Sequence, residues 1–345
     1  MIVSVSRRCD IPAWGMDAFM ADLAAGFRLV PNPFDARKAR RVSLAPEDVD
    51  CLVFWTRNPR AILEREAELR ARGYPFIVQV TITGYPRALE PGAPDREEVA
   101  ATLRELASRI GSRRIAWRYD PVIATRPDDA PDIIAPPARP RLDATFHATN
   151  FAAIAESLEG AAGRVILSLI DEYGNTRKRL ARAGYPDAVF ASPRGAPARS
   201  APASGAGDSG AAGVMASPGA AKGASGRRAS GAAGQGYLPG FGTERETAEP
   251  RLPPPPYPAI LEALASAARE RGLGLQSCAE DFDLEGFGIR REACIDGDLI
   301  REICGKDLEP GRDGGQRPAC LCAKSVDIGV YGPCPAACAY CYARR

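Results

Sequence analysis

The sequence predicts an α/β protein, most simply a (β/α) barrel of the TIM type built on a parallel sheet. Short apolar or β-branched runs alternate about six times with helical patterns, which is typical of parallel strands joined by crossover helices. No G-x-G-x-x-G follows the first run, so the sequence does not indicate a dinucleotide-binding sheet. Polar residues follow most of the runs, and barrels of this class place their chemistry at the carboxyl ends of their strands.

The first five predicted strands each lead through a polar turn into a predicted helix that ends at a glycine, and the sixth predicted strand follows a helix. Asp95 is the expected N-cap and Gly111 the expected end of one such helix. The predicted strands are 2–6, 51–55, 76–82, 113–117, 164–170 and 273–277. The predicted helices are 16–26, 61–73, 95–111, 149–160, 171–184 and 259–272, and residues 27–44 are expected to form a small hairpin.

A seventh strand is expected over residues 326–330, immediately before three closely spaced cysteines. In a closed barrel the last strand lies beside the first. We therefore expect this strand to pair with residues 2–6 and to deliver the cysteines to the active-site mouth.

Composition divides the chain into three parts. Residues 1–190 and 257–345 are expected to form the first and last parts of the barrel. Residues 191–256 are rich in Ala, Gly, Ser and Pro, cannot bury a core, and are expected to be a disordered insertion. A shorter proline-rich loop is expected over 126–141.

The charge and the apolar pattern indicate the compartment and the partners. The net charge is +2, so no global basic field favours nucleic acid, which is disfavoured as a partner without being excluded. No apolar run approaches the ~20 residues that span a bilayer, so no membrane partner is expected. The sequence is interpreted as a cytoplasmic protein.

The cysteines are placed unevenly along the chain. There are ten, and eight of them lie between residues 278 and 341. In a reducing compartment such crowding indicates metal ligation before it indicates disulfides. The only histidine is His147, which argues against zinc sites built on imidazole.

Cys334, Cys338 and Cys341 have the spacing C-x3-C-x2-C, with Tyr340 before the last cysteine. Three thiolates on one loop can hold three irons of a cubane cluster and leave the fourth iron open. This pattern resembles the cluster loop of radical S-adenosylmethionine enzymes, and its CAYCY wording is similar to that of spore photoproduct lyase. The resemblance implies a [4Fe–4S] cluster, S-adenosylmethionine as cofactor, and an electron donor such as flavodoxin or ferredoxin. It further implies a 5′-deoxyadenosyl radical that acts on an unidentified substrate.

In that superfamily the cluster loop follows the first barrel strand, whereas here it follows the last, so the resemblance implies a circularly permuted barrel. Its Gly-Gly-Glu contact to the methionine amino group would then fall at the end of the first predicted strand. Asp10 is the expected acceptor for the amino group, and an arginine there could bind the carboxylate. Several strand-end arginines could equally form salt bridges or receive an anionic substrate. The expected cofactor-binding residues are Ser6, Arg7, Arg8, Asp10, Arg118, Asp120 and Tyr340.

Cys278, Cys294, Cys320 and Cys322 form a second set of four thiols. Four thiols suffice for an auxiliary [4Fe–4S] cluster or for a tetrahedral zinc ion. Cys320 and Cys322 are closer than the usual C-x2-C knuckle, which slightly favours iron–sulfur. Isolated buried cysteines that pack as small hydrophobes are the alternative.

The chain also resembles, nearly end to end, domain-of-unknown-function family 1848. The phrases that carry this resemblance are SVSRRCDIP, VDCLVFWTRNP, WRYDPVI, QSCAEDFDLEGFGI, CIDGDLI and SVDIGVYGPCPAACAYCYA. The resemblance implies no activity of its own. Two alternatives to a radical enzyme therefore stay open, a non-catalytic iron–sulfur or zinc-binding barrel and a DNA-repair lyase like spore photoproduct lyase.

Overall fold

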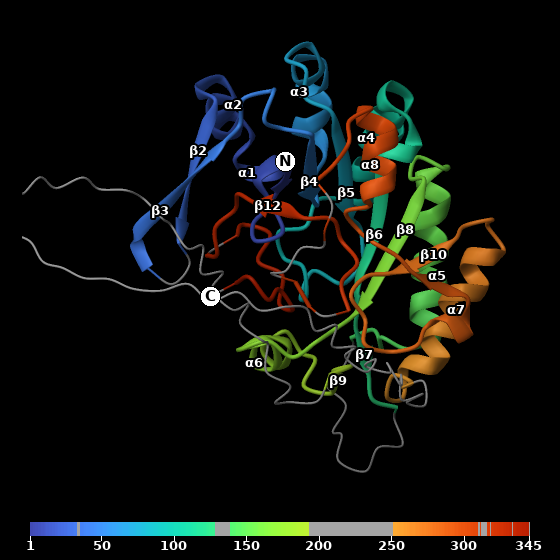
Figure 1. Ribbon diagram of the computed structural model, residues 1–345. Helices are drawn as coiled ribbons and strands as arrows, with labels where there is room; N and C mark the ends of the chain where they lie inside the picture. The colour runs from blue at the N-terminus through green and yellow to red at the C-terminus, as the bar shows by residue number, and fades with distance from the viewer. Residues whose placement is uncertain are drawn as a thin grey trace, which may run out of the picture. The chain divides into compact units, whose positions relative to one another are not determined.

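The computed structural model describes residues 1–32, 35–127, 139–192, 251–309, 311, 316–317, 319–332 and 334–344 (Figure 1). Most of the expected insertion, residues 193–250, lies outside the described residues, as do residues 128–138 of the proline-rich loop. None of the helices in the described part of the chain is long and apolar enough to cross a lipid bilayer.

One parallel sheet of eight strands organises the fold. Its order is β11-β10-β8-β6-β5-β4-β1-β12, and every pairing in it is parallel. All seven predicted strands are present, and β11 is an eighth that was not predicted. The strands are β1 (Ile2–Val5), β4 (Cys51–Thr56), β5 (Phe76–Thr81), β6 (Ile115–Val122), β8 (Arg164–Leu169), β10 (Leu275–Ser277), β11 (Ile289–Arg291) and β12 (Ser325–Asp327).

The last strand lies beside the first, as expected. β12 pairs in parallel with β1, with Val3 opposite Val326. Among the described residues no pairing joins β11 to β12, so these two short strands are the edges of the sheet. The structure therefore gives an eight-stranded parallel sheet but does not show the closure that the barrel prediction requires.

A row of four helices covers one face of the sheet. In Figure 1, α4, α5 and α7 run alongside β6, β8 and β10, and α3, α4, α5 and α7 contact one another in that order. The helices are α1 (Ile11–Trp14), α2 (Met16–Ala25), α3 (Arg60–Ala71), α4 (Arg96–Ile110), α5 (Ala144–Leu158), α6 (Thr176–Arg182), α7 (Tyr257–Arg269) and α8 (Gly297–Cys304), with 3-10 turns η1 (Ser112–Arg114) and η2 (Glu285–Phe287). The expected hairpin is the antiparallel pair β2 (Phe27–Asn32) and β3 (Asp35–Ser43), and β7 (Ala124–Thr125) pairs with β9 (Ala188–Val189).

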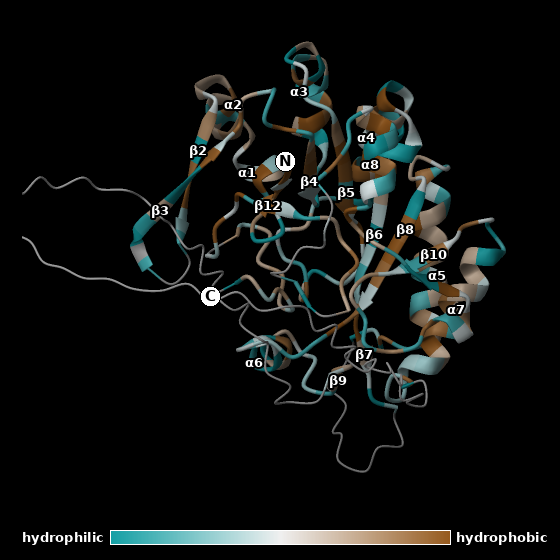
Figure 2. Cartoon of the chain, in the orientation of Figure 1, coloured by the Kyte–Doolittle hydropathy of each residue, from teal (hydrophilic) through white to brown (hydrophobic). Residues whose placement is uncertain are grey.

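The two faces of the sheet bury different cores because side chains alternate along each strand. Leu52 and Phe54 of β4 belong to the large core with the helices, whereas Cys51 and Val53 face the other way. Figure 2 shows the apolar residues along β5 and β8. The smaller core combines Cys51 and Val53 with Ile295 and Ile300, so α8 and the chain around it cover the opposite face of the sheet.

Candidate functional site

The C-terminal cysteine loop, defined here as residues 334–344, is docked against the segment that follows β5. The Ala339 N–H donates to the Leu89 carbonyl at 2.9 Å, and the Gly92 N–H donates to the Ala336 carbonyl at 3.1 Å. A Cβ at position 92 would lie 2.2 Å from the Pro335 carbonyl oxygen, so only glycine permits this approach. The cysteines near the end of the chain are therefore held by the fold.

Tyr340 anchors this loop through buried charged partners. Arg57 donates to the Tyr340 hydroxyl, and that hydroxyl donates to the Glu90 carboxylate. Arg57 also pairs with Glu90 at 2.9 Å, and Thr83 donates to the same carboxylate. Burial raises the pKa of Tyr340, so its hydroxyl stays protonated and can donate. Glu90 was not predicted from the sequence, because its partner Tyr340 lies 250 residues away along the chain.

The three sulfurs of the loop differ in exposure. Cys338 is buried, with 6% of its surface exposed, whereas Cys334 and Cys341 are partly exposed. Burial raises the pKa of Cys338 to about 11, although the nearby Arg57 guanidinium acts in the opposite direction. Arg179 donates to the carbonyls of Ala339 at 3.0 Å and Cys341 at 2.6 Å. Cationic groups thus lie on two sides of the loop.

The residues expected at the end of the first strand converge on Asp327 of β12. Ser6 Oγ donates to this carboxylate at 2.7 Å and the Arg7 N–H donates at 2.8 Å. The Arg7 and Arg8 guanidinium groups lie 3.6 and 3.9 Å from it. The Gly329 N–H donates to the same carboxylate at 2.9 Å, so Asp327 joins the carboxyl ends of β1 and β12.

Asp10 caps α1 and holds the end of β4. Its two carboxylate oxygens accept the N–H of Ala13 at 3.0 Å and the N–H of Arg57 at 2.7 Å. Desolvation raises the pKa of this carboxyl group. Binding of S-adenosylmethionine by Ser6, Arg7, Arg8 or Asp10 stays a prediction.

Arg118 and Asp120 lie together on β6. Arg118 donates to Asp120 and lies over the Trp55 ring, 4.9 Å from its centroid. Ser168 of β8 also donates to Asp120. The two residues form a neutralised pair between neighbouring strands, and their expected role toward a cofactor stays a prediction.

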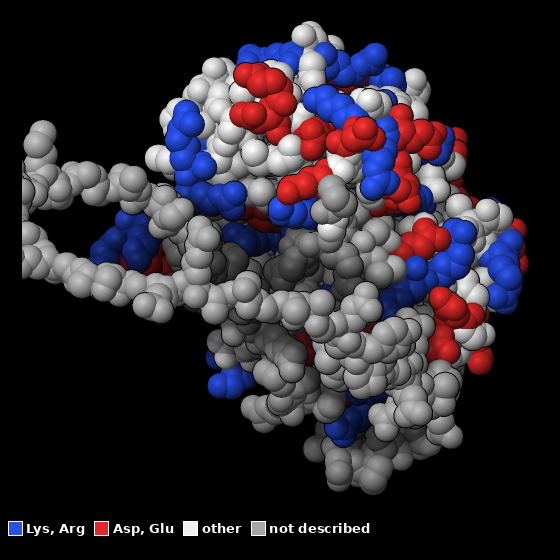
Figure 3. All heavy atoms as spheres, in the orientation of Figure 1, with Lys and Arg blue, Asp and Glu red and all other residues white. Residues whose placement is uncertain are grey.

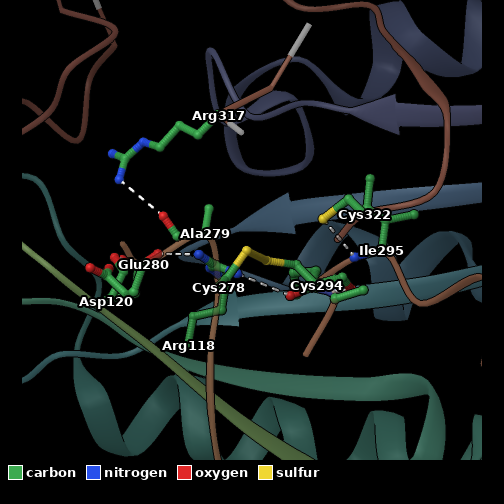
Figure 4. The surroundings of a disulfide bond; sticks show 12 residues. Arg118, Asp120, Cys278, Ala279, Glu280, Cys294, Ile295, Arg317 and Cys322 are labelled. Carbon is green, nitrogen blue, oxygen red and sulfur yellow. Dashed lines mark hydrogen bonds and ion pairs between the residues drawn. A yellow bond between two sulfur atoms is a disulfide. The ribbon is translucent and has the colours of Figure 1, made fainter. Parts of the chain in front are cut away.

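The structure brings together three of the four cysteines in the second set. The sulfurs of Cys278, Cys294 and Cys322 all lie within 4.8 Å of one another, and among the described residues this is the one group of metal-ligand side chains that meets this limit. Cys278 and Cys294 form a disulfide with a Cα–Cα distance of 6.2 Å (Figure 4). Cys320 lies two residues before Cys322 in the sequence. A hydrogen bond from its thiol lowers the pKa of the Cys322 thiol.

Charged groups surround this second cysteine group (Figure 4). Gln79 Nε2 donates to the Cys294 carbonyl at 2.7 Å, which fixes the chain that follows β11. Glu280 follows Cys278 by two residues, and burial raises the pKa of its carboxyl group to about 8 although Leu169 N–H donates to it at 2.9 Å. Arg317 forms an ion pair with Asp171, which lies two residues after the end of β8. In the second cysteine group, Cys278 and Cys294 follow β10 and β11, whereas Cys322 precedes β12.

A cavity of about 240 Å³ lies beside the anchors of the C-terminal cysteine loop. Arg57, Glu90 and Thr83 line it, together with Tyr85 and the first turn of α4. It therefore lies where β4 and β5 end, and a small polar molecule bound there would lie next to the Tyr340 anchors.

Sequence comparison gives a family for most of this chain. The family model described as "Domain of unknown function (DUF1848)" matches residues 2–195 and 246–343. The matched residues include both cysteine groups and every strand of the eight-stranded sheet. No curated protein matched the chain.

Proposed function

Because the chain belongs to the DUF1848 family, whose description assigns no activity, we propose its function from its own site. We propose an iron–sulfur enzyme of the radical S-adenosylmethionine type, in which Cys334, Cys338 and Cys341 hold a [4Fe–4S] cluster. One observation carries the proposal. β12 pairs in parallel with β1, and β1, β4 and β5 are parallel neighbours. The C-x3-C-x2-C loop therefore follows the carboxyl end of a strand, on the side of the sheet where β1, β4 and β5 also have their carboxyl ends.

The C-terminal cysteine loop fits such a cluster. Its three sulfurs do not all lie within 4.8 Å of one another, in contrast to the second cysteine group within the described residues. Cys338 nevertheless lies near the other two, because the charges of Cys341 and Cys334 contribute to raising its pKa. Arg57 and Arg179 lie beside the loop and would compensate the negative charge of bound thiolates.

When bound, the cluster would supply the electron that cleaves S-adenosylmethionine to the 5′-deoxyadenosyl radical. The residues of the chain have other tasks. Arg57, Glu90 and Tyr340 fix the loop, and the apolar core that includes Cys338 excludes water from one side of it. The Arg57–Glu90 ion pair lines the adjoining cavity, which supports a polar ligand there. The partial exposure of Cys334 and Cys341 gives an electron donor such as flavodoxin or ferredoxin a side from which to approach.

The test is anaerobic reconstitution of the full chain with iron and sulfide. We expect about four iron and four sulfide atoms per chain in the wild type and a cluster spectrum that changes when S-adenosylmethionine is added. Cys338→Ala should lose the cluster. Cys304→Ala is the matched control, because this partly buried cysteine belongs to neither cysteine group, and it should behave as the wild type. Equal iron in Cys338→Ala and the wild type would contradict the proposal.

A second candidate is a non-catalytic metal-binding protein. The group of Cys278, Cys294 and Cys322 favours it, because this group could hold a metal ion without any S-adenosylmethionine chemistry. The DNA-repair alternative has less support. On the face drawn in Figure 3, Lys and Arg are interspersed with Asp and Glu, whereas a basic stripe is the usual footprint for nucleic acid.

A further inference from the structure

The second cysteine group lies where the two edges of the sheet come together. Cys278 and Cys294 follow β10 and β11, and Cys322 precedes β12. The Ala323 N–H donates to the Ile295 carbonyl at 3.0 Å, and the Ile295 N–H donates to Cys322 Sγ at 3.4 Å. The chain after one edge strand is thus bonded to the chain before the other, although no strand pairing joins them in the described residues.

We propose that Cys278, Cys294, Cys320 and Cys322 bind one tetrahedral, zinc-class metal ion that clamps the β10–β11 end of the sheet to the segment leading into β12. This site is separate from the cluster proposed for the C-terminal cysteine loop, and neither depends on the other.

The sulfur spacing favours a single ion over a cluster. Thiolates about 2.3 Å from one tetrahedral ion lie about 3.8 Å from one another. The sulfurs of Cys278, Cys294 and Cys322 all meet a limit of 4.8 Å, so the three can share one ion once the Cys278–Cys294 bond is reduced and its two sulfurs separate. This differs from the slight preference for iron–sulfur that the tight Cys320–Cys322 spacing gave in the sequence.

Cys320 completes the ligand set. It is 4% exposed and lies two residues before Cys322; its sulfur is not among the three that lie within 4.8 Å of one another, so it would move to join them on metal binding. The group also has the supporting contacts that metal-bound thiolates require. The Ile295 N–H donates directly to the Cys322 sulfur, and Gln79 of β5 holds the Cys294 carbonyl at 2.7 Å. Figure 4 shows Cys322 on its own segment, with the Cys278–Cys294 pair on the strand side.

The metal form requires the reduced thiols. Cys278 and Cys294 are joined in the structure, and a thiol reductant releases them by a two-electron reduction that adds one proton to each sulfur. Metal binding then displaces the thiol protons to solvent. The disulfide and the metal site are therefore alternative states of the same residues.

The test measures metal in the full chain purified under a thiol reductant. We expect about one zinc ion per chain, and a cobalt-loaded form with the absorption bands of tetrahedral thiolate coordination. A variant with Cys334, Cys338 and Cys341 all changed to Ala removes the proposed cluster and should keep the zinc. Cys278→Ser combined with Cys322→Ser should lose it, and Cys320→Ser should bind it more than about tenfold more weakly in competition with a chelator.

The matched control is Cys51→Ala, because Cys51 is fully buried in the same apolar core but lies outside the group. It should keep the zinc. If the double variant does not fold, chelation of the wild type replaces it: removing the ion should lower the melting temperature by several degrees, and zinc should restore it.

Three results would overturn the proposal. The first is a chain that keeps the Cys278–Cys294 disulfide and binds no metal under reductant. The second is iron with labile sulfide in the variant that lacks the three loop cysteines. The third is unchanged zinc in the folded double variant. The second result would show that the second cysteine group binds an iron–sulfur cluster instead of a single ion. None of the three results decides whether the C-terminal cysteine loop binds iron.

Discussion

Gly92 lies where the C-terminal cysteine loop passes closest to the segment after β5. A Cβ there would lie 2.2 Å from the Pro335 oxygen and 2.9 Å from the Ala336 Cα, and both are backbone atoms. We expect Gly92→Ala to displace the loop, to lower the free energy of unfolding by about 1–3 kcal/mol and to reduce iron uptake severalfold. Urea unfolding and iron analysis after reconstitution measure these effects.

Gly286→Ala is the control for this prediction, because a Cβ at position 286 meets no atom within 4 Å. It should leave stability and iron uptake unchanged. If Gly92→Ala behaved like Gly286→Ala, the close docking of the loop would be wrong.

His147 is the only histidine in the chain and it is fully buried. One ring nitrogen contacts the Tyr119 hydroxyl at 2.9 Å and the other contacts the Ile123 carbonyl at 2.9 Å. Burial lowers the pKa of His147 from 6.5 to about 4. Between these values the unfolded chain binds the proton and the folded chain does not, so stability is complete above pH 6.5 and declines as the pH falls toward 4.

We expect this histidine to reduce the free energy of unfolding by about 2 kcal/mol between pH 7.5 and pH 5. His147→Gln should lack this part of the pH dependence. Because there is a single imidazole, its NMR signals can be followed directly, and they should keep the neutral shift down to about pH 5. A native titration near pH 6.5 would show that the ring is accessible to protons and would contradict the prediction.

At the scale of elements, the junction of β1 and β12 depends on Asp327. This carboxylate accepts from Ser4, Ser6 and two backbone N–H groups, and its side chain is 6% exposed. In Asp327→Asn an amide N–H₂ would face donors that need an acceptor. We expect a loss of about 2–4 kcal/mol of stability and faster proteolysis of the chain after β12.

Asp298→Asn is the control variant for Asp327→Asn. Asp298 is 91% exposed, and its ion pair with Arg301 on α8 should contribute little to the free energy of unfolding. Limited proteolysis followed by mass spectrometry locates the first cleavage. Equal protection of residues 325–344 in both variants would show that Asp327 does not hold the last strand.

The elements that sequence reasoning found share a strong local signal. The six strands predicted between residues 2 and 277 have apolar runs. The last strand was predicted over residues 326–330, whereas β12 begins one residue earlier and ends three residues earlier, at Ser325–Asp327. β11 was missed because Ile289–Arg291 has three residues, two of them arginine. Barrel closure could not be decided from local pattern, because it depends on pairing between strands that are distant in the sequence.

The same contrast holds within the site. The cysteines were identified as candidate metal ligands because a cluster of thiols in a sequence is itself typical of metal binding. Cys278, Cys294 and Cys322 do lie together in the structure. Glu90, Asp327 and Gly92 were not predicted as parts of the site. Each contacts a partner more than about 240 residues away in the sequence, and these partners are Tyr340, Ser6 and Pro335 in the same order. An acidic residue or a glycine in a loop has no local pattern that reveals such a partner.

At the scale of the whole molecule, the family model leaves out residues 196–245. Every strand of the eight-stranded sheet and every cysteine lies outside that segment. We expect replacement of residues 202–245 by a short Gly/Ser linker to change the free energy of unfolding by less than about 1 kcal/mol, since the cost of closing a loop grows only slowly with its length. The metal content of the chain should also be unchanged. A clear loss of stability or of bound metal would show that the segment has a structural role.

The measurement that tests the central claim most directly is turnover of S-adenosylmethionine by the reconstituted chain under anaerobic conditions with dithionite. We expect 5′-deoxyadenosine from the wild type and from Cys304→Ala, and none from Cys338→Ala, because Cys338 is the buried ligand of the proposed cluster. A wild-type chain that holds an intact cluster, gives no change of its spectrum with S-adenosylmethionine and forms no 5′-deoxyadenosine would contradict the radical function. The C-terminal cysteine loop would then be a non-catalytic metal site.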